Sequence, residues 1–304
     1  ERNSLARNLP TDVEMINRGY QAGAEVGLAW KRDDSLQVLT GLNYEFSHAD
    51  PYLFEEVATG NPTASSPWRD SHSVSDYSLF AQALYNHDTP HQWTFGGRFN
   101  HNEDSKGVFS PRVGYVWAVN PTTTFKALYA QAFRNPDFFE KQVNTPGVLI
   151  GDDKLEHEKV QSLDLALELI PEDSNLKHVA NVFYLVASDI ISRAATATPG
   201  EFQYKNGSDN HFWGLEYSLK TGMVNHRSWF LSYSYKEGHD DTNDVALKYL
   251  AKHSGSAGLT WQVGSQLAAS PNMIYVGRRE DVGDFALFNL TLSYAINKDW
   301  SASL

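Results

Sequence analysis

The sequence has 304 residues, with 37 Asp and Glu against 25 Lys and Arg, for a net charge of -12. That excess of negative charge disfavours nucleic acid as a partner. Cysteine is absent, which excludes disulfides, a thiolate nucleophile and Cys-based metal centres. No stretch approaches the roughly 18 apolar residues of a membrane helix, so helical membrane proteins are excluded, although 13% of the residues are aromatic.

Apolar and polar residues alternate with a period of two from about residue 18 to the end, which indicates β-strands throughout. On the first strand, this alternation predicts Tyr20, Val26, Leu28 and Trp30 on the outward face and Gln21 and Glu25 on the inward face. Fourteen strands are predicted, over residues 18–31, 35–48, 76–87, 91–101, 109–119, 123–134, 159–170, 176–192, 203–221, 227–237, 253–263, 266–277, 284–296 and 299–304. Pro111 and Pro136 are expected at or beyond strand ends, where a missing N–H does no harm.

The aromatic residues of the first strand mark the two edges of an apolar band. Tyr20 and Trp30 lie ten residues apart on one face, which spans roughly 25 Å for a strand tilted near 40°. Tyr77 and Tyr85 bracket a second such band. This height is typical of a lipid-facing surface between two aromatic girdles, so the sequence predicts a transmembrane β-barrel.

The connections between strands alternate strictly in length. Short turns follow every second strand, and the longer connections between them cover residues 49–75, 102–108, 135–158, 193–202, 238–252 and 278–283. Antiparallel outer-membrane barrels have short periplasmic turns and long outer loops. We therefore predict an all-β, antiparallel barrel in meander order, built as one domain.

Several short motifs follow one another at hairpin spacing. They include Tyr77–Gln82, Gly96–Phe99, Phe109–Arg112, Tyr129–Pro136, Leu155–Glu158, Asn181–Tyr184, Tyr204–Gly207 and Phe288–Tyr294. In this order they resemble the barrel of TonB-dependent outer-membrane receptors, from about Arg18 to Leu304.

The resemblance implies a 22-stranded barrel with a plugged lumen. About fourteen strands are predicted here, and no plug segment precedes them. We therefore interpret residues 1–304 as a partial receptor barrel, with the plug domain and the first strands absent. A self-sufficient 14-stranded barrel stays open as an alternative.

The resemblance also implies a function in the bacterial outer membrane: active import of a scarce chelate, expected to be a ferric siderophore, with energy from the TonB complex. Expected partners are membrane lipid, lipopolysaccharide, the plug domain, the TonB complex through the missing N-terminal part, and the chelate. No catalytic motif or cofactor is expected, and the chain is not expected to be an enzyme. A passive porin-like channel, a secretion barrel, and a receptor for haem, cobalamin or an oligosaccharide remain alternatives.

Charged residues fall on the faces expected to line the lumen. Each would cost about 2–4 kcal/mol facing lipid at the midplane, so an inward position is favoured. Two roles are open for them: contact with a plug domain or an anionic ligand, or ion pairs with one another around a water-filled lumen. The residues singled out are Arg98, Arg112, Lys126, Arg134 and Glu216.

The long loops are the predicted capture surface, because loops carry binding residues on a rigid scaffold. Aromatic residues there suit a flat aromatic or chelate ligand, with packing between loops as the alternative. The candidates are Tyr52, Phe54, Trp68, Phe138, Phe139 and His157.

No metal centre is predicted. Several histidines are expected at the outer side of the barrel. Each of them is interpreted either as a haem ligand or as a solvated loop side chain; they are His48, His72, His101, His157, His239 and His253. Acidic loops could bind calcium through oxygen ligands or remain solvated. These are Asp240, Asp241 and Asp244, and Asp152 with Asp153.

Overall fold

The computed structural model describes residues 13–16, 18–51, 53–61, 70–86 and 90–304. All fourteen predicted strands are present, with ends that differ from the predicted ones by a few residues. They are β2 (Gly19–Lys31), β3 (Leu36–Ala49), β5 (His72–Tyr85), β6 (His91–Asn102), β7 (Val108–Asn120), β8 (Thr123–Arg134), β11 (Glu158–Leu169), β12 (Leu176–Ala195), β13 (Phe202–Thr221), β14 (Arg227–Asp240), β16 (His253–Val263), β17 (Leu267–Val276), β18 (Phe285–Ala295) and β19 (Ser301–Ser303).

Short elements that the alternation did not predict lie within or before the long connections. They are β1 (Val13–Ile16), β4 (Leu53–Glu56), α1 (Phe138–Gln142), β9 (Asn144–Thr145), β10 (Leu149–Ile150) and β15 (Val245–Ala246). β1 and β4 pair with each other as a separate two-stranded sheet. Among the described residues, no helix is long and apolar enough to cross a membrane.

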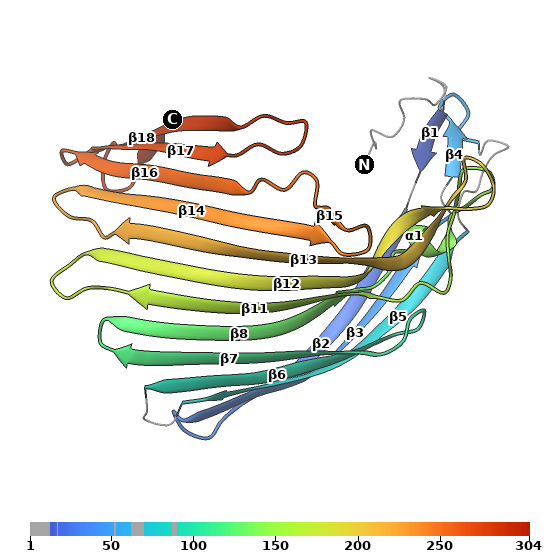
Figure 1. Cartoon of the computed structure of the whole chain (residues 1–304), viewed down its shortest axis with the longest axis horizontal. Helices are drawn as coiled ribbons and strands as arrows, with labels where there is room; N and C mark the ends of the chain where they lie inside the picture. The colour runs from blue at the N-terminus through green and yellow to red at the C-terminus, as the bar shows by residue number, and fades with distance from the viewer. Residues whose placement is uncertain (1–12, 17, 52, 62–69, 87–89) are drawn as a thin grey trace.

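The fourteen predicted strands pair antiparallel in chain order, which confirms the predicted meander, and the sheet curves into a barrel (Figure 1). The long connections lie at one end of the barrel, together with α1, β4 and β15, and the short turns lie at the other end. We call the first end the outer end.

Residues in register across neighbouring strands share one face of the sheet, so each face can be followed from strand to strand. The face of Val26 continues through Leu42 and Leu79 and stays apolar and exposed, with Val26 74% exposed. The opposite face of Glu25 continues through Asn43, Ser78 and Asn100, all polar. In a membrane barrel the apolar side faces lipid, so we call the polar side the inner wall.

The expectation for Pro111 was wrong, because this proline lies inside β7, opposite Gly97 of β6. β7 begins its pairing with β8 only at Arg112. The missing N–H of Pro111 is therefore tolerated on a stretch of strand that has a neighbour on one side only.

Candidate ligand-capture site at the outer end

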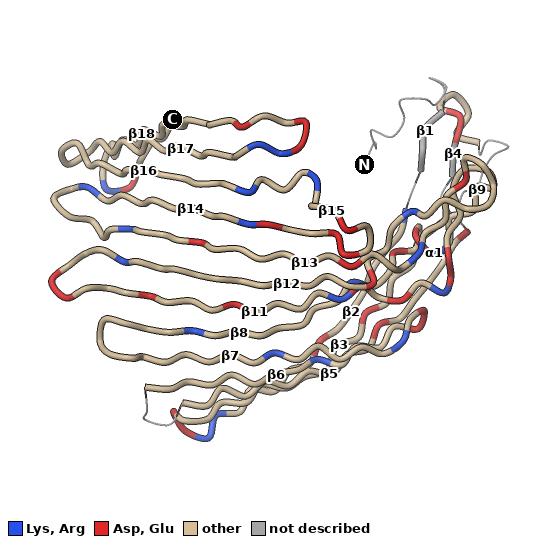
Figure 2. Tube along the Cα trace, viewed as in Figure 1, with Lys and Arg blue, Asp and Glu red and all other residues tan. Residues whose placement is uncertain are grey.

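Charged residues gather where the long connections meet the strand ends, around α1 and β15, and the middle of the strands carries few of them (Figure 2). This end of the barrel holds the candidate site. The longest connection that the structure describes in full runs from β8 to β11; together with Glu158, the first residue of β11, we call it the 135–158 loop.

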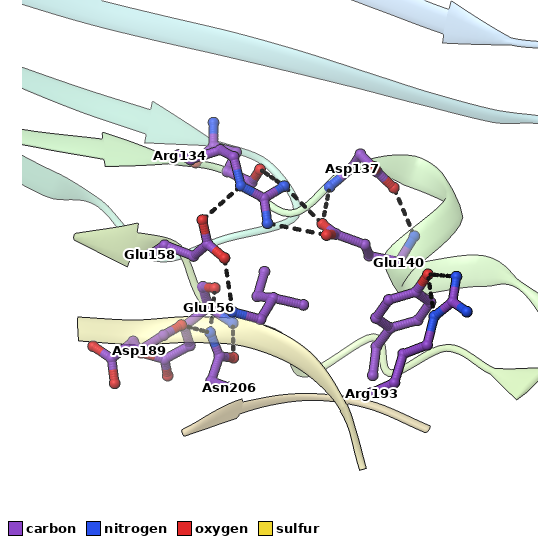
Figure 3. Close-up of polar contacts among 11 residues, drawn as sticks. Arg134, Asp137, Glu140, Glu156, Glu158, Asp189, Arg193 and Asn206 are labelled. Carbon is purple, nitrogen blue, oxygen red and sulfur yellow. Dashed lines mark hydrogen bonds and ion pairs between the residues drawn. The ribbon is translucent and has the colours of Figure 1, made fainter. Parts of the chain in front are cut away.

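Arg134, at the outer end of β8, joins this loop to the barrel wall (Figure 3). Its Nε donates to Glu158 Oε2 at 2.6 Å, and its Nη1 and Nη2 donate to the two oxygens of Glu140 at 2.9 and 3.0 Å. Glu158 also accepts the backbone N–H of Ile191 at 2.7 Å. One guanidinium thus ties β8, α1 and β11 together, and Glu158 extends the link to β12.

Glu140 also caps the N-terminus of α1. Asp137 accepts the N–H of Glu140 at 2.7 Å, while the Glu140 carboxylate accepts the N–H of Asp137 at 2.9 Å. This reciprocal arrangement is a capping box, which satisfies N–H groups that a helix end leaves unpaired. The same carboxylate therefore starts α1 and anchors it to Arg134.

The far end of the loop is held by Asn206 of β13. Its Oδ1 accepts the N–H of Glu156 at 2.9 Å, and its Nδ2 donates to the carbonyls of Glu156 and Asp189 at 2.9 and 2.8 Å. The Glu156 carboxylate pairs with Lys106, and that ammonium lowers the pKa of Glu156 below its ordinary value. The loop is thus bound to β13 on one side and to the 102–108 connection on the other.

A third attachment passes through Lys141 of α1, which is 7% exposed. Its ammonium donates to the carbonyl of Asp104, whose carboxylate lies 2.5 Å from His72 Nε2. Gly151 packs directly on the backbone of Lys141, since a Cβ there would lie 2.4 Å from the Lys141 carbonyl oxygen. These contacts hold α1 against Asp104 and against Gly151.

Phe138 and Phe139, two predicted ligand-binding residues, begin α1 and are half-buried. The Phe138 ring meets His72 edge-on at 5.2 Å, and the Phe139 ring meets Tyr204 at 6.5 Å. Arg193 donates to the Tyr204 hydroxyl at 3.1 Å, and its guanidinium lies 5.4 Å from the ring centre. The structure therefore places Phe139 next to a tyrosine–arginine pair that the sequence reasoning missed.

His157, another predicted ligand-binding residue, is 4% exposed and packs edge-on against Phe133 at 5.9 Å. Burial lowers its pKa. Its imidazole does not lie on an open surface of this structure. Of the remaining candidates, Tyr52 and Trp68 lie outside the described residues. Phe54 belongs to β4, and only the backbone of this residue is described.

The predicted inner-wall residues divide into two groups. Arg134 and Lys126 have carboxylate partners, the latter 3.1 Å from Glu168 Oε2. Arg98 and Arg112 have no ion pair within the part of the chain that the structure describes, and Glu216 lines a cavity of about 480 Å³ on β12–β17. Arg134 thus pairs with carboxylates of the chain itself, and the two other arginines pair with none that the structure describes.

Four of the five acidic residues considered for calcium accept hydrogen bonds from, or pair with, protein groups, and Asp152 does so by accepting the N–H of Lys154 at 2.9 Å. Asp240 accepts from the N–H groups of Thr242 and Asn243, Asp241 lies 2.8 Å from His211 Nδ1, and Asp244 lies 3.0 Å from His239 Nε2. Over the described ranges, no group of three or more His, Asp or Glu side chains is arranged to hold a metal ion.

A family model described as TonB dependent receptor-like, beta-barrel matches residues 2–304. The chain therefore belongs to the TonB-dependent receptor family, through its β-barrel, and its location is the bacterial outer membrane. This confirms the resemblance drawn from the motifs.

Two curated relatives are both called iron-regulated outer membrane virulence protein and come from two strains of Vibrio cholerae serotype O1. Each is 29% identical over 204 residues, which cover 61% of this chain and 31% of the relative. The chain thus spans less than a third of the length of these relatives.

Solved structures share the fold at low identity. The ferric enterobactin receptor PfeA of Pseudomonas aeruginosa superposes with a TM-score of 0.78 at 17% identity, over 95% of this chain and 48% of that chain. The siderophore receptor PirA from Pseudomonas aeruginosa gives 0.70 at 16%, over 96% and 51%. The copper transporter OprC gives 0.76 at 17%, over 94% and 50%. The chain spans about half of each, and the likeness establishes the fold alone.

Proposed function

We propose that the chain is the wall and outer mouth of a receptor that captures a ferric siderophore and imports it with energy from the TonB complex. The observation that carries the proposal is the 135–158 loop, which Arg134, Asn206 and Lys141 hold against the barrel. A loop fixed in this way loses little conformational entropy when a ligand binds, so more of the contact energy appears as affinity.

The side chains that this loop carries favour an aromatic, anionic chelate. Phe139 stands beside Tyr204, and the exposed guanidinium of Arg193 lies against the Tyr204 ring. Aromatic faces suit stacking with flat rings, and arginine suits oxyanions. The name of the Vibrio cholerae relatives, an iron-regulated outer membrane protein, supports an iron chelate as the cargo. The likeness to the copper transporter OprC leaves the ligand to experiment, since a shared fold does not fix it.

The test uses the receptor as the cell expresses it, in a host that lacks its own siderophore receptors. Uptake of ⁵⁵Fe is measured with a tris-catecholate, a hydroxamate and a citrate chelate, with haem and cobalamin as the other arms. We expect saturable uptake of one iron chelate that stops when TonB is deleted or the proton gradient is collapsed. Uptake that is linear in concentration and insensitive to TonB would instead establish a passive channel. Saturable uptake of haem or cobalamin alone would reassign the ligand.

In a binding titration with the chelate that the receptor imports, replacing Phe138 and Phe139 together with Ala should weaken binding by roughly 30- to 1,000-fold, because two aromatic contacts contribute about 2–4 kcal/mol. The barrel should stay folded, since neither residue belongs to a strand. A change below about threefold would assign both rings to packing between loops.

A further inference from the structure

Two neighbouring arginines on the inner wall have no carboxylate partner among the described residues, whereas three other inner-wall cations do. Lys126 and Lys177 both contact Glu168, and Arg134 contacts Glu140 and Glu158. Arg98 of β6 and Arg112 of β7 have no ion pair among the described residues. Their charges are left to be balanced by something outside this part of the chain.

The register of β6 and β7 sets these two arginines at opposite corners of a square. Arg98 is paired with Ser110, and Gly96 is paired with Arg112. Diagonal neighbours in a sheet lie roughly 7–8 Å apart, within reach of long side chains. The other two corners carry only a hydroxymethyl group and a hydrogen, so both guanidinium groups have room to converge.

Ser110 adds a free hydrogen-bonding group to this square. Its hydroxyl oxygen is buried and, among the described residues, has no hydrogen-bond partner. A buried polar atom without a partner is costly, commonly about 1–3 kcal/mol, and calls for an explanation. An oxyanion between the two arginines would accept the Ser110 hydroxyl and remove that cost.

The neighbouring side chains leave this region open. Gln82 of β5 is paired with Gly96 and extends the polar surface. Phe80, paired with Arg98, turns toward β3, because a Cβ on Gly41 would lie 2.5 Å from its Cζ. The ring is thus turned away from the square and toward the neighbouring strand.

A cavity of about 730 Å³ occupies this part of the wall, in the range of small-molecule sites. Its lining includes Phe80, Gln82, Arg98, Ser110, Arg112 and Leu128, and no Asp or Glu is among the described residues that line it.

We propose that Arg98, Arg112 and Ser110 form an oxyanion-binding cradle on the inner wall, which takes a carboxylate or a similar anionic oxygen group. Two guanidinium groups offer paired N–H donors that match such a group, and they remain charged at any physiological pH. The anion has two sources: the chelate during import, or an acidic side chain from another part of the receptor. The first of these rests on the proposed function, and the second does not.

The first experiment needs no transport. The receptor as the cell expresses it is purified in detergent, and citrate is titrated while the melting temperature and the heat of binding are recorded. The variants are R98A/R112A, which removes both charges, and Ser110→Ala. Lys126→Ala is the matched control, because it removes an inner-wall cation that already has a carboxylate partner.

An open cradle binds citrate, and R98A/R112A should then raise the Kd at least tenfold, with about a threefold rise for Ser110→Ala and none for Lys126→Ala. A cradle occupied by the receptor's own carboxylate leaves citrate unbound. In that case R98A/R112A should lower the melting temperature and raise the conductance of the receptor in a planar bilayer, relative to Lys126→Ala. The proposal is overturned if citrate binds all variants alike, or if none of these measurements separates R98A/R112A from Lys126→Ala.

If the cradle binds citrate, a second experiment tests whether it also binds the imported chelate. Uptake of ferric enterobactin, an anionic tris-catecholate, should fall at least tenfold in R98A/R112A, while its affinity for intact cells changes less than twofold. Uptake of an uncharged ferric hydroxamate should not change. If the unmodified receptor imports no chelate at all, the proposed function fails, while the citrate and melting measurements still decide whether the cradle exists.

Discussion

Replacing Arg134 with Met should release the 135–158 loop without unfolding the barrel. Arg134 makes three hydrogen bonds to two carboxylates, at 2.6, 2.9 and 3.0 Å. The change leaves Glu140 and Glu158 without a counter-charge, although the side chains of both are largely buried, at 13% and 17% exposure. Two unpaired carboxylates close together then destabilise the docked loop.

The size of the effect follows from the exposure of the pair. A hydrogen bond to a charged group contributes about 1.5–3 kcal/mol, and a fully exposed ion pair about 0–1 kcal/mol. The Arg134 side chain is 45% exposed, so solvent screens part of the attraction. We expect a loss of about 2 kcal/mol, which raises the opening constant of the loop about 30-fold.

Hydrogen–deuterium exchange of peptides from residues 135–158 measures this opening directly. Arg134→Lys should give an intermediate rate, because it keeps the charge and loses the fork that serves both carboxylates. Lys177→Met is the control, since it removes a cation that pairs with Glu168 on a distant part of the wall. Exchange in Arg134→Met within threefold of the unmodified receptor would refute this account of the loop.

Three further predictions concern the same loop. Burial lowers the pKa of His157, so the opened loop binds a proton more readily than the docked loop, and the loop loses stability as the pH falls below about 6.5. Hydrogen–deuterium exchange of the loop, corrected for its intrinsic pH dependence, should therefore become faster as the pH is lowered from 7.5 to 5.5. His157→Phe should abolish this increase, and an equal increase in the variant would show that another group is responsible. Asn206→Ala removes three hydrogen bonds to the backbone, so residues 152–158 should become accessible to limited proteolysis while the strands stay protected. An unchanged cleavage pattern would show that the pairing of β10 alone holds the end of the loop next to β11. Gly151→Ala should prevent docking of α1, because the Cβ of the alanine would overlap the Lys141 carbonyl. The near-UV circular dichroism and the chelate affinity of the variant test this prediction, and unchanged values for both would refute it.

Most strands were predictable because they obey one local rule. Alternation of apolar and polar residues decides which face meets lipid, so most long strands could be found from their own sequences, although both faces of 176–192 are apolar. The strand predicted over 176–192 extends to Ala195, because an irregularity after Ala187, where Asp189 has a φ of 58°, shifts the register and the pairing then resumes. No alternation signal survives such an irregularity.

The site was less predictable, because it depends on contacts between residues distant in the sequence. Asn206 recognises Glu156 from 50 residues away, and Lys141 reaches the Asp104 carbonyl from 37 residues away. Neither contact leaves a local pattern. One signal was present and went unused: Asp137 followed three residues later by Glu140 is the spacing of a capping box, which predicts the start of α1.

The inner-wall arginines show how partners, rather than position, separate structural from functional charge. Arg134, Arg98 and Arg112 were predicted together, from the same alternation and for the same energetic reason. In the structure the chain supplies two carboxylates to Arg134, so this charge is used to hold a loop. For Arg98 and Arg112, the described part of the chain supplies no carboxylate; around them lie a glycine, a serine whose hydroxyl has no partner among the described residues, and an open cavity. A protein with a net charge of -12 has carboxylates in excess, so two arginines that pair with none of the described carboxylates form a site where an anion from elsewhere is expected to bind.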